Sequence, residues 1–195
     1  MLGLFPGLDH AQGGIQVAAN SALPAFTDGA FDAVVFGCDP LNTVYGARRS
    51  VIEDNKRRLV RRIASQRWQA DTLLVWHIGM LKLLPLLRGF RGRIVLFCHG
   101  IELWRPHGWL TRRLLRRVDL FLSNSDYTWV RFLEYAPYLR GRAQITTALG
   151  CGEPIAGATP VAEVIPTAAI VARMVKGEDY KGHRELIEAW PRVLK

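Results

Sequence analysis

Cysteine is scarce in this chain: only Cys38, Cys98 and Cys151 occur among 195 residues. So few and so widely separated cysteines favour a reducing compartment over a disulfide scaffold. They form no Cys-x-x-Cys pair and no Cys/His cluster with the spacing of a zinc site. Because apolar residues make up 49% of the chain, a hydrophobic core can form without disulfide or metal staples.

Long apolar runs are also missing. The N-terminus has no basic segment ahead of an extended apolar stretch, so no signal peptide is evident. No run approaches the ~20 residues that a membrane-spanning helix needs. We therefore expect a cytoplasmic protein, and a peripheral position on the inner membrane face stays open.

Acidic residues are the third shortage, since 17 Asp and Glu face 26 Lys and Arg and give a net charge of +9. This excess favours a polyanionic neighbour: nucleic acid, an anionic membrane or a phosphate-bearing ligand. No helix-turn-helix, RNP, zinc-finger or KH pattern is present, so we expect no nucleic-acid partner. The GxGxxG fingerprint is absent as well, which argues against a Rossmann-type oxidoreductase.

What the sequence does contain is an alternation of strand and helix patterns. The expected helices are amphipathic or apolar segments at residues 15–22, 55–68, 80–87, 110–117 and 127–135. The expected strands are short unbroken apolar runs at residues 2–5, 31–36, 72–76, 94–98, 120–122 and, more weakly, 145–148. Such runs are typical of strands buried on both faces. The alternation predicts an α/β fold, a Rossmann-like parallel sheet flanked by helices.

The composition changes near residue 150. Residues 1–150 are expected to form the Rossmann-like domain, and residues 151–166, rich in Gly, Pro and Ala, a linker. Residues 167–195 hold one strand pattern (168–174) and one helix pattern (183–194). One strand and one helix cannot bury their own apolar faces. We therefore expect a second domain that is incomplete, or a segment that packs on the first.

Candidate ligand-binding residues follow the predicted strands, where open parallel sheets bind ligands. Gly13 and Gly14 precede a helix whose N-terminus favours an anion, although a tight turn would equally need them. His99 and Glu102 follow the strand at 94–98, and this pair can hydrogen-bond a ligand or transfer protons. A structural histidine is the alternative for His99, and it is the preferred interpretation of His77.

Further candidates are basic. Arg173 and Lys181 flank the loop VKGEDY and suit a diphosphate, although solvated surface charge is the commoner interpretation. The helix at 55–68, with Trp68 or Trp109 nearby, forms a basic surface that can dock on anionic lipid. A solvated helix face explains the same pattern. The expected membrane-facing residues are Arg57, Arg58, Arg61 and Arg62.

The ordered segments GGIQ, HGIELW, SNSDYTW and ARMVKGEDYKGH resemble glycosyltransferase family 4 of the GT-B fold. The last is the most specific, although Ala172 stands where the family usually has glycine. The resemblance implies a retaining hexosyltransferase that needs no metal or other cofactor. It would move a sugar from a nucleotide-sugar to a glycan, lipid or small-molecule acceptor, in polysaccharide or glycolipid biosynthesis.

The resemblance also implies roles for individual residues. Arg173 and Lys181 would bind the donor diphosphate, with Gly13 and Gly14 facing the phosphates. His99 would be the catalytic histidine that contacts the transferred sugar, and Glu102 would lie on the acceptor side. The chain would comprise the N-terminal lobe and the start of the C-terminal donor-binding lobe. The family's acidic E-x7-E segment would lie beyond Lys195, so we expect this chain to be inactive alone.

The alternative is a non-catalytic remnant, or a module that binds an acceptor or an anionic membrane. Nucleotide-sugar turnover would exclude this alternative, whereas lipid binding without turnover would favour it.

Overall fold

The computed structural model describes residues 1–8, 13–26, 31–37, 44, 46–149, 167–170 and 181–193. Its contacts divide the chain into two compact units, Met1–Gly152 and Glu153–Lys195. The predicted linker lies outside the described residues, and so does Arg173. The assignment of residues 1–150 and 167–195 to two lobes therefore stays a prediction.

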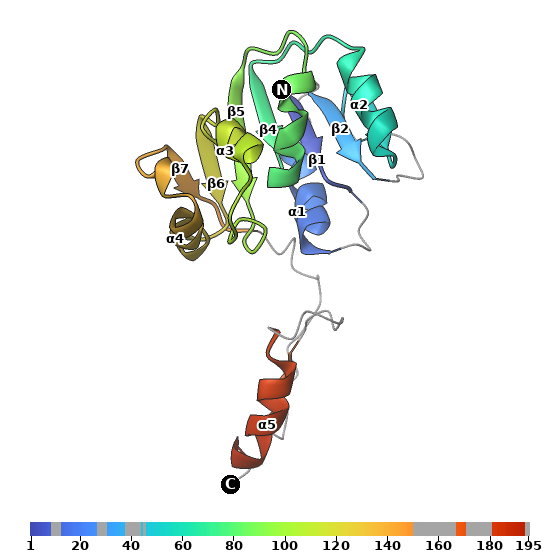
Figure 1. Cartoon of the computed structure of the whole chain (residues 1–195). Helices are drawn as coiled ribbons and strands as arrows, with labels where there is room; N and C mark the ends of the chain where they lie inside the picture. The colour runs from blue at the N-terminus through green and yellow to red at the C-terminus, as the bar shows by residue number, and fades with distance from the viewer. Residues whose placement is uncertain are drawn as a thin grey trace. The chain divides into compact units, whose positions relative to one another are not determined.

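Seven parallel strands form one sheet in the first unit, in the order β3-β2-β1-β4-β5-β6-β7 (Figure 1). The sheet confirms the predicted Rossmann-like α/β fold. The strands are β1 (Leu2–Phe5), β2 (Asp32–Phe36), β3 (Arg49–Glu53), β4 (Thr72–Val75), β5 (Arg93–Cys98), β6 (Leu120–Ser123) and β7 (Gln144–Thr146).

The strand order reverses at β1. Leu4 of β1 pairs with Val34 of β2 on one side and with Val75 of β4 on the other. The chain first winds from β1 toward β3 and then returns to build β4 to β7 in the opposite direction. In sheets of this kind, ligands bind outside the carboxyl ends of the strands at the reversal. The carboxyl ends of β1 and β4 are therefore the first place to look for a site.

Helices and 3-10 segments connect the strands. Where a helix was expected at residues 80–87, the chain forms a 3-10 helix, because Pro85 lacks the amide that an α-helix needs and its ring clashes with the preceding turn. The elements are α1 (Gly14–Ala22), η2 (Leu23–Phe26), α2 (Lys56–Ala64), η3 (Ile78–Leu86), α3 (Trp109–Leu115), α4 (Asp126–Tyr135), η4 (Pro137–Leu139) and, in the second unit, α5 (His183–Val193).

Helix α2 is shorter than expected. Asn55 caps its start by accepting the amides of Arg57 and Arg58, and the helix ends at Ala64. Trp68 lies beyond this end, fully buried, and its indole N–H donates to the carbonyl of Ile63 at 3.0 Å. The sequence interpretation of Trp68 as part of a lipid-facing surface was therefore wrong, because the ring belongs to the core.

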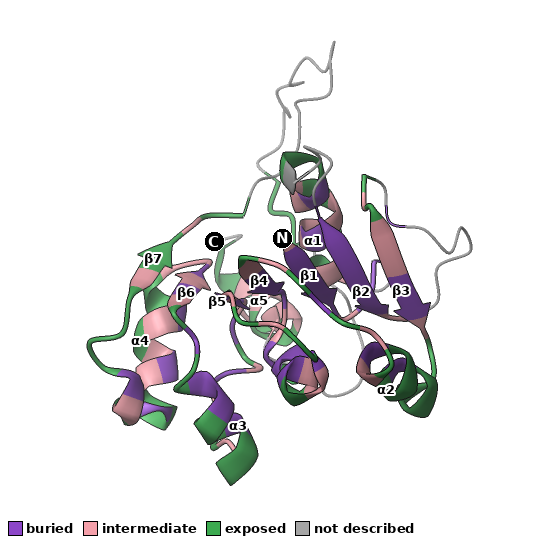
Figure 2. Cartoon of the chain, turned by 90° about the horizontal axis from the view of Figure 1, so that it is seen from above, coloured by how far each residue is buried: buried purple, intermediate pink, exposed green. Residues whose placement is uncertain are grey.

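The strands alternate their side chains between two hydrophobic clusters, one on each face of the sheet. Leu2 and Leu4 contribute to the larger cluster, together with buried residues of α2, η3, α3 and α4. Phe5 contributes to the other cluster, which includes Ala19 of α1. Figure 2 shows that the central strands are almost entirely buried, whereas the outer sides of α2 and α3 are exposed.

Strand β3 was not predicted from the sequence. It lies at one edge of the sheet, and only Val51 and Ile52 within it are buried. Its position is fixed by the buried carboxylate of Asp32, which accepts hydrogen bonds from Arg48 at 3.2 Å and Arg49 at 2.7 Å. Charged residues are common on edge strands, where they discourage pairing with other chains.

In the second unit, α5 follows Gly182, whose φ of +82° lies in the region that favours glycine. No residue of α5 is buried in this structure. Residues 167–170 form no regular element, and the remainder of the strand expected at 168–174 lies outside the described residues. In the described part of the chain, no helix is long and apolar enough to cross a membrane.

Candidate functional site

His99 directly follows β5, in a tight turn at the carboxyl edge of the sheet. Gly100 has a φ of +152°, and one carboxylate oxygen of Glu102 (Oε1) accepts the amides of both His99 (2.8 Å) and Gly100 (3.0 Å). The side-chain amide of Asn124, which follows β6, donates to the carbonyl of His99 at 2.6 Å. The expected pair of His99 and Glu102 thus forms one structure, in which Glu102 holds the backbone of the turn.

The His99 ring is held in one tautomer. Its Nε2 lies 2.7 Å from the carbonyl oxygen of Trp76, and because a carbonyl only accepts, Nε2 carries the proton. Burial lowers the pKa of His99, against the opposing effects of the Trp76 bond and of Glu102. The neutral ring therefore has its lone pair on Nδ1, which is buried and has no hydrogen-bond partner in the described structure.

A row of aromatic rings crosses the sheet beside this turn. Phe5, Trp76, Phe97 and His99 come from or directly follow β1, β4 and β5. Ring centroids are 6.1 Å apart between Phe5 and Trp76, and 4.6 Å apart for both Trp76–Phe97 and Phe97–His99. The indole N–H of Trp76 donates to the carbonyl of Ile15 at 2.9 Å. The row therefore ties the first turn of α1 to the His99 turn.

Sequence reasoning missed Trp76 and Phe97 as parts of the site. The signal was present: aromatic residues stand at or just after the ends of three expected strands. This pattern could be interpreted only with the knowledge that β1, β4 and β5 are neighbours in the sheet.

The glycine pair opens α1 on the same edge of the sheet. Gly13 is the N-cap, with a φ of +136° that favours glycine, and it offers no side-chain cap. A Cβ on Gly14 would meet no atom within 4 Å. The first turn of α1 holds no acidic residue. Among the described residues, no side chain caps the start of α1, and a phosphate-binding helix start needs amides that are available in this way.

His77 follows Trp76 at the end of β4 and has a structural role, as expected. Its Nδ1 accepts the amide of Gly79 at 3.0 Å and so caps η3. Burial lowers the pKa of His77, and Glu102 and Arg105 act on it electrostatically in opposite directions. The ring also lines a cavity of about 260 Å³ between η3 and the segment before α3.

The described structure does not test the two expected diphosphate ligands. Lys181 lies in the second unit, just before α5, and Arg173 lies outside the described residues. Their role stays a prediction. Among the described residues, no group of three His, Cys, Asp or Glu side chains could hold a metal ion.

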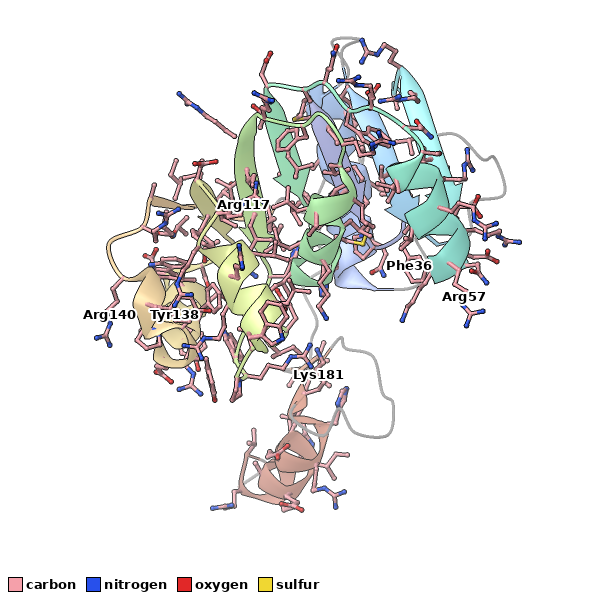
Figure 3. The ribbon with its side chains drawn as sticks, turned by 45° about the horizontal axis from the view of Figure 1, so that its top comes forward. Phe36, Arg57, Arg117, Tyr138, Arg140 and Lys181 are labelled. Atoms are coloured by element: carbon pink, nitrogen blue, oxygen red, sulfur yellow. The ribbon has the colours of Figure 1, made fainter. Side chains whose placement is uncertain are left out.

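The arginines of α2 differ in their surroundings. Arg58 bonds Glu53 (3.0 Å) and Asp54 (2.6 Å), and Arg62 bonds Glu53 (2.9 Å). Arg57 and Arg61 form no ion pair with any described residue, and Figure 3 shows Arg57 extending away from the helix. Half of the expected membrane-facing charge is therefore neutralised locally, and membrane contact stays a prediction.

No family model and no curated protein matches this chain. Among solved structures, HepE of Anabaena in complex with UDP and glucose matches with a TM-score of 0.53 and 16% identity, over 77% of this chain and 44% of that one. An alpha-glucosyltransferase in complex with UDP-glucose and DNA containing an abasic site matches with a TM-score of 0.43 and 15% identity, over 74% of this chain and 41% of that one. The chain thus spans less than half the length of either neighbour. The likeness to HepE shows the fold alone, a Rossmann-like parallel sheet flanked by helices, as the sequence predicted.

Proposed function

We propose that this chain forms the acceptor-side lobe of a GT-B glycosyltransferase, which transfers a hexosyl group from a nucleotide-sugar to an acceptor. The observation that carries the proposal is the His99 turn, where a neutral imidazole with a buried, unpartnered Nδ1 follows β5 near the reversal of the strand order. The shared fold with HepE, which was solved with UDP and glucose, supports a nucleotide-sugar donor.

His99 contacts the transferred sugar in this proposal. Nδ1 is buried in the described structure, so the side chains around it must move before it accepts a hydrogen bond from a sugar hydroxyl. The Trp76 carbonyl holds Nε2 and so fixes the plane of the ring. An oriented acceptor of this kind lowers the entropic cost of reaching the transition state. Glu102 acts on the backbone of the turn and is a positioning residue on the acceptor side.

The donor diphosphate is assigned to the amides at the start of α1, with Gly13 and Gly14 facing it and Arg173 and Lys181 supplying positive charge. Stabilising the charge that develops on the departing diphosphate is the main electrostatic task of such a transfer. We assign the enzyme to family 4, with retention of configuration and no metal. The acceptor is a glycan, a lipid or a small molecule of polysaccharide or glycolipid biosynthesis.

The test is a panel of nucleotide-sugars on the protein as isolated from its source, with donor binding measured by calorimetry and transfer by release of the nucleoside diphosphate. His99→Ala should lower kcat by at least about 100-fold, with donor affinity within about threefold of the unaltered protein. Full activity of the variant would remove His99 from the mechanism. A matched surface variant, Arg140→Gln, should leave both quantities unchanged, since Figure 3 shows Arg140 pointing away from the fold.

A non-catalytic module that binds an anionic membrane is the second candidate. Trp109 is 75% exposed at the start of α3, and an exposed tryptophan beside arginines suits a lipid interface. Vesicle binding without donor binding or turnover would favour this candidate and exclude the first.

A further inference from the structure

The cavity beside His77 has a lining that none of the roles above explains. It lies between η3 and the segment that leads into α3, and none of its described lining residues is acidic. Its polar lining consists of two cations, two imidazoles and a hydroxyl: Lys82, Arg105, His77, His107 and Thr111. The two cations and the side chains of His77 and Thr111 can donate hydrogen bonds, whereas a neutral His107 donates its Nε2 proton to the carbonyl of Leu103 at 3.2 Å and keeps Nδ1 as an acceptor.

In the part of the chain that the structure describes, neither cation has a carboxylate partner. Lys82 and Arg105 are exposed and form no ion pair within the described part of the chain. The carboxylate that acts electrostatically on His77 is that of Glu102, and its Oε1 already accepts two backbone amides. Among the described lining residues, no acidic side chain therefore neutralises the positive charges of Lys82 and Arg105.

The neutral groups also present donors. Because His77 Nδ1 accepts the amide of Gly79, a neutral His77 ring carries its proton on Nε2. Thr111 is 9% exposed, and its hydroxyl forms no hydrogen bond within the described residues. An ammonium, a guanidinium, an imidazole N–H and a hydroxyl together match the oxygens of a phosphate group.

The cavity also adjoins the proposed acceptor side. His77 and His99 interact electrostatically, and the two residues follow the neighbouring strands β4 and β5. At about 260 Å³, the cavity is smaller than the ~300–1,000 Å³ of pockets that enclose a whole drug-sized ligand. It therefore suits one group of a larger molecule that extends toward His99.

We propose that this cavity binds a phosphate group of the acceptor, carried either by a soluble sugar phosphate or by a lipid at a membrane surface. The inference rests on the proposed function, because it names the chemical class of the acceptor for that same site. Lys82 and Arg105 hold the phosphate by charge, and His77 and Thr111 fix its orientation by hydrogen bonds.

The experiment compares the protein, at the length found in its source cells, with the double variant Lys82→Gln/Arg105→Gln and with the matched control Arg117→Gln/Arg140→Gln, which removes two exposed arginines that do not line the cavity (Figure 3). One arm measures glucose 1-phosphate and glucose by calorimetry, with UDP present to occupy the donor site. The other arm measures sedimentation with two kinds of phosphatidylcholine vesicle. One contains phosphatidic acid, and the other, its phosphate-free partner, contains oleate of equal charge.

The unaltered protein should bind glucose 1-phosphate, or phosphatidic acid vesicles, at least about tenfold more tightly than the phosphate-free partner probe. The cavity variant should lose this preference, and the control should keep it within about twofold. A loss confined to the soluble arm identifies a sugar phosphate, and a loss confined to the vesicle arm identifies a lipid phosphate. Equal losses in both variants, no loss in the cavity variant, or no preference for phosphate would overturn the inference.

Binding of UDP, followed in the same samples, separates the two proposals. UDP binding without cavity-dependent phosphate binding would overturn only this inference. Cavity-dependent phosphate binding without UDP binding would sink the proposed function and leave an anion site that serves another purpose.

Discussion

The buried imidazole of His99 makes stability depend on pH. Burial lowers its pKa in the folded protein, so below the ordinary value of about 6.5 the unfolded chain binds more protons than the folded one. The free energy of unfolding should therefore fall as pH drops through this window, by at most about 1.4 kcal/mol per pH unit for this group.

Urea unfolding from about pH 7.5 to 5.5 measures this slope, a range that lies above the ordinary titration of Asp and Glu. His99→Gln should flatten the dependence without removing it, because burial also lowers the pKa of His77 and His107. An unchanged slope in the variant would mean that His99 does not contribute.

The two glycines at the start of α1 should respond differently to alanine. Gly13 has a φ of +136°, so Gly13→Ala should lower the free energy of unfolding by about 1–3 kcal/mol. A Cβ on Gly14 would meet open space, and Gly14→Ala should be neutral or stabilising by up to about 1 kcal/mol. Chemical unfolding of the matched pair checks both values, and equal effects would contradict the described backbone.

For single residues, the sequence predicted where a side chain lies on the sheet better than it predicted which groups surround that side chain. His99 could be placed because a residue just after a buried strand lies at the carboxyl edge of the sheet. Its tautomer could not, because it depends on the carbonyl of Trp76 on a neighbouring strand. The lipid-facing interpretation of Trp68 was wrong for a similar reason, because the direction in which a ring after a helix points depends on the core that it meets.

Among the elements, the turn from His99 to Trp104 depends on one carboxylate. Glu102→Ala would remove both bonds to backbone amides, and we expect a loss of about 1.5–3 kcal/mol in the free energy of unfolding. Glu102→Gln keeps an oxygen that can accept both amides, so stability and kcat should largely return. Chemical unfolding and steady-state transfer assays check this rescue. If Gln fails while Ala is active, Glu102 has a role other than holding the turn.

Helix α2 offers a matched test of membrane contact. Arg58 and Arg62 are paired with acidic residues, whereas Arg57 and Arg61 are not paired in the described structure. Arg57→Gln/Arg61→Gln should therefore weaken sedimentation with anionic vesicles more than Arg58→Gln/Arg62→Gln, by about 1 kcal/mol per residue near the surface. Equal and negligible effects would remove α2 from any membrane surface.

Elements were predictable where burial was two-sided. The central strands stood out as apolar runs. Strand β3 was missed because its edge position leaves charged residues at both ends. The 3-10 geometry of η3 depends on Pro85. The sequence shows that this proline would disturb an α-helix at residues 80–87, but it does not show that a 3-10 helix forms instead.

For the whole molecule, the proposed chemistry requires cations from the chain in place of a metal. The net charge is +9, and positively charged side chains can neutralise a diphosphate without a divalent ion. EDTA should therefore leave transfer within about twofold of its untreated rate. The check is nucleoside diphosphate release before and after chelation, with added Mg²⁺ as the control. A loss of activity that Mg²⁺ restores would contradict the proposal.

The parallel sheet was predictable from the alternation of strand and helix patterns alone, since strands that are separated by helices lie parallel. The strand order could not be obtained in this way, because it depends on which neighbours pack together across the chain. For that reason the aromatic row and the cavity beside His77 became visible only in three dimensions.

Trp76 has a consequence for how this protein can be observed. Its indole is bonded to the first turn of α1, its carbonyl is bonded to His99, and the residue as a whole is 3% exposed. The emission of a buried indole responds to small changes in its surroundings. A chain in which the other tryptophans are replaced would therefore carry an intrinsic fluorophore between the glycine loop and the histidine. With it, the order in which two ligands arrive could be followed in real time without a label.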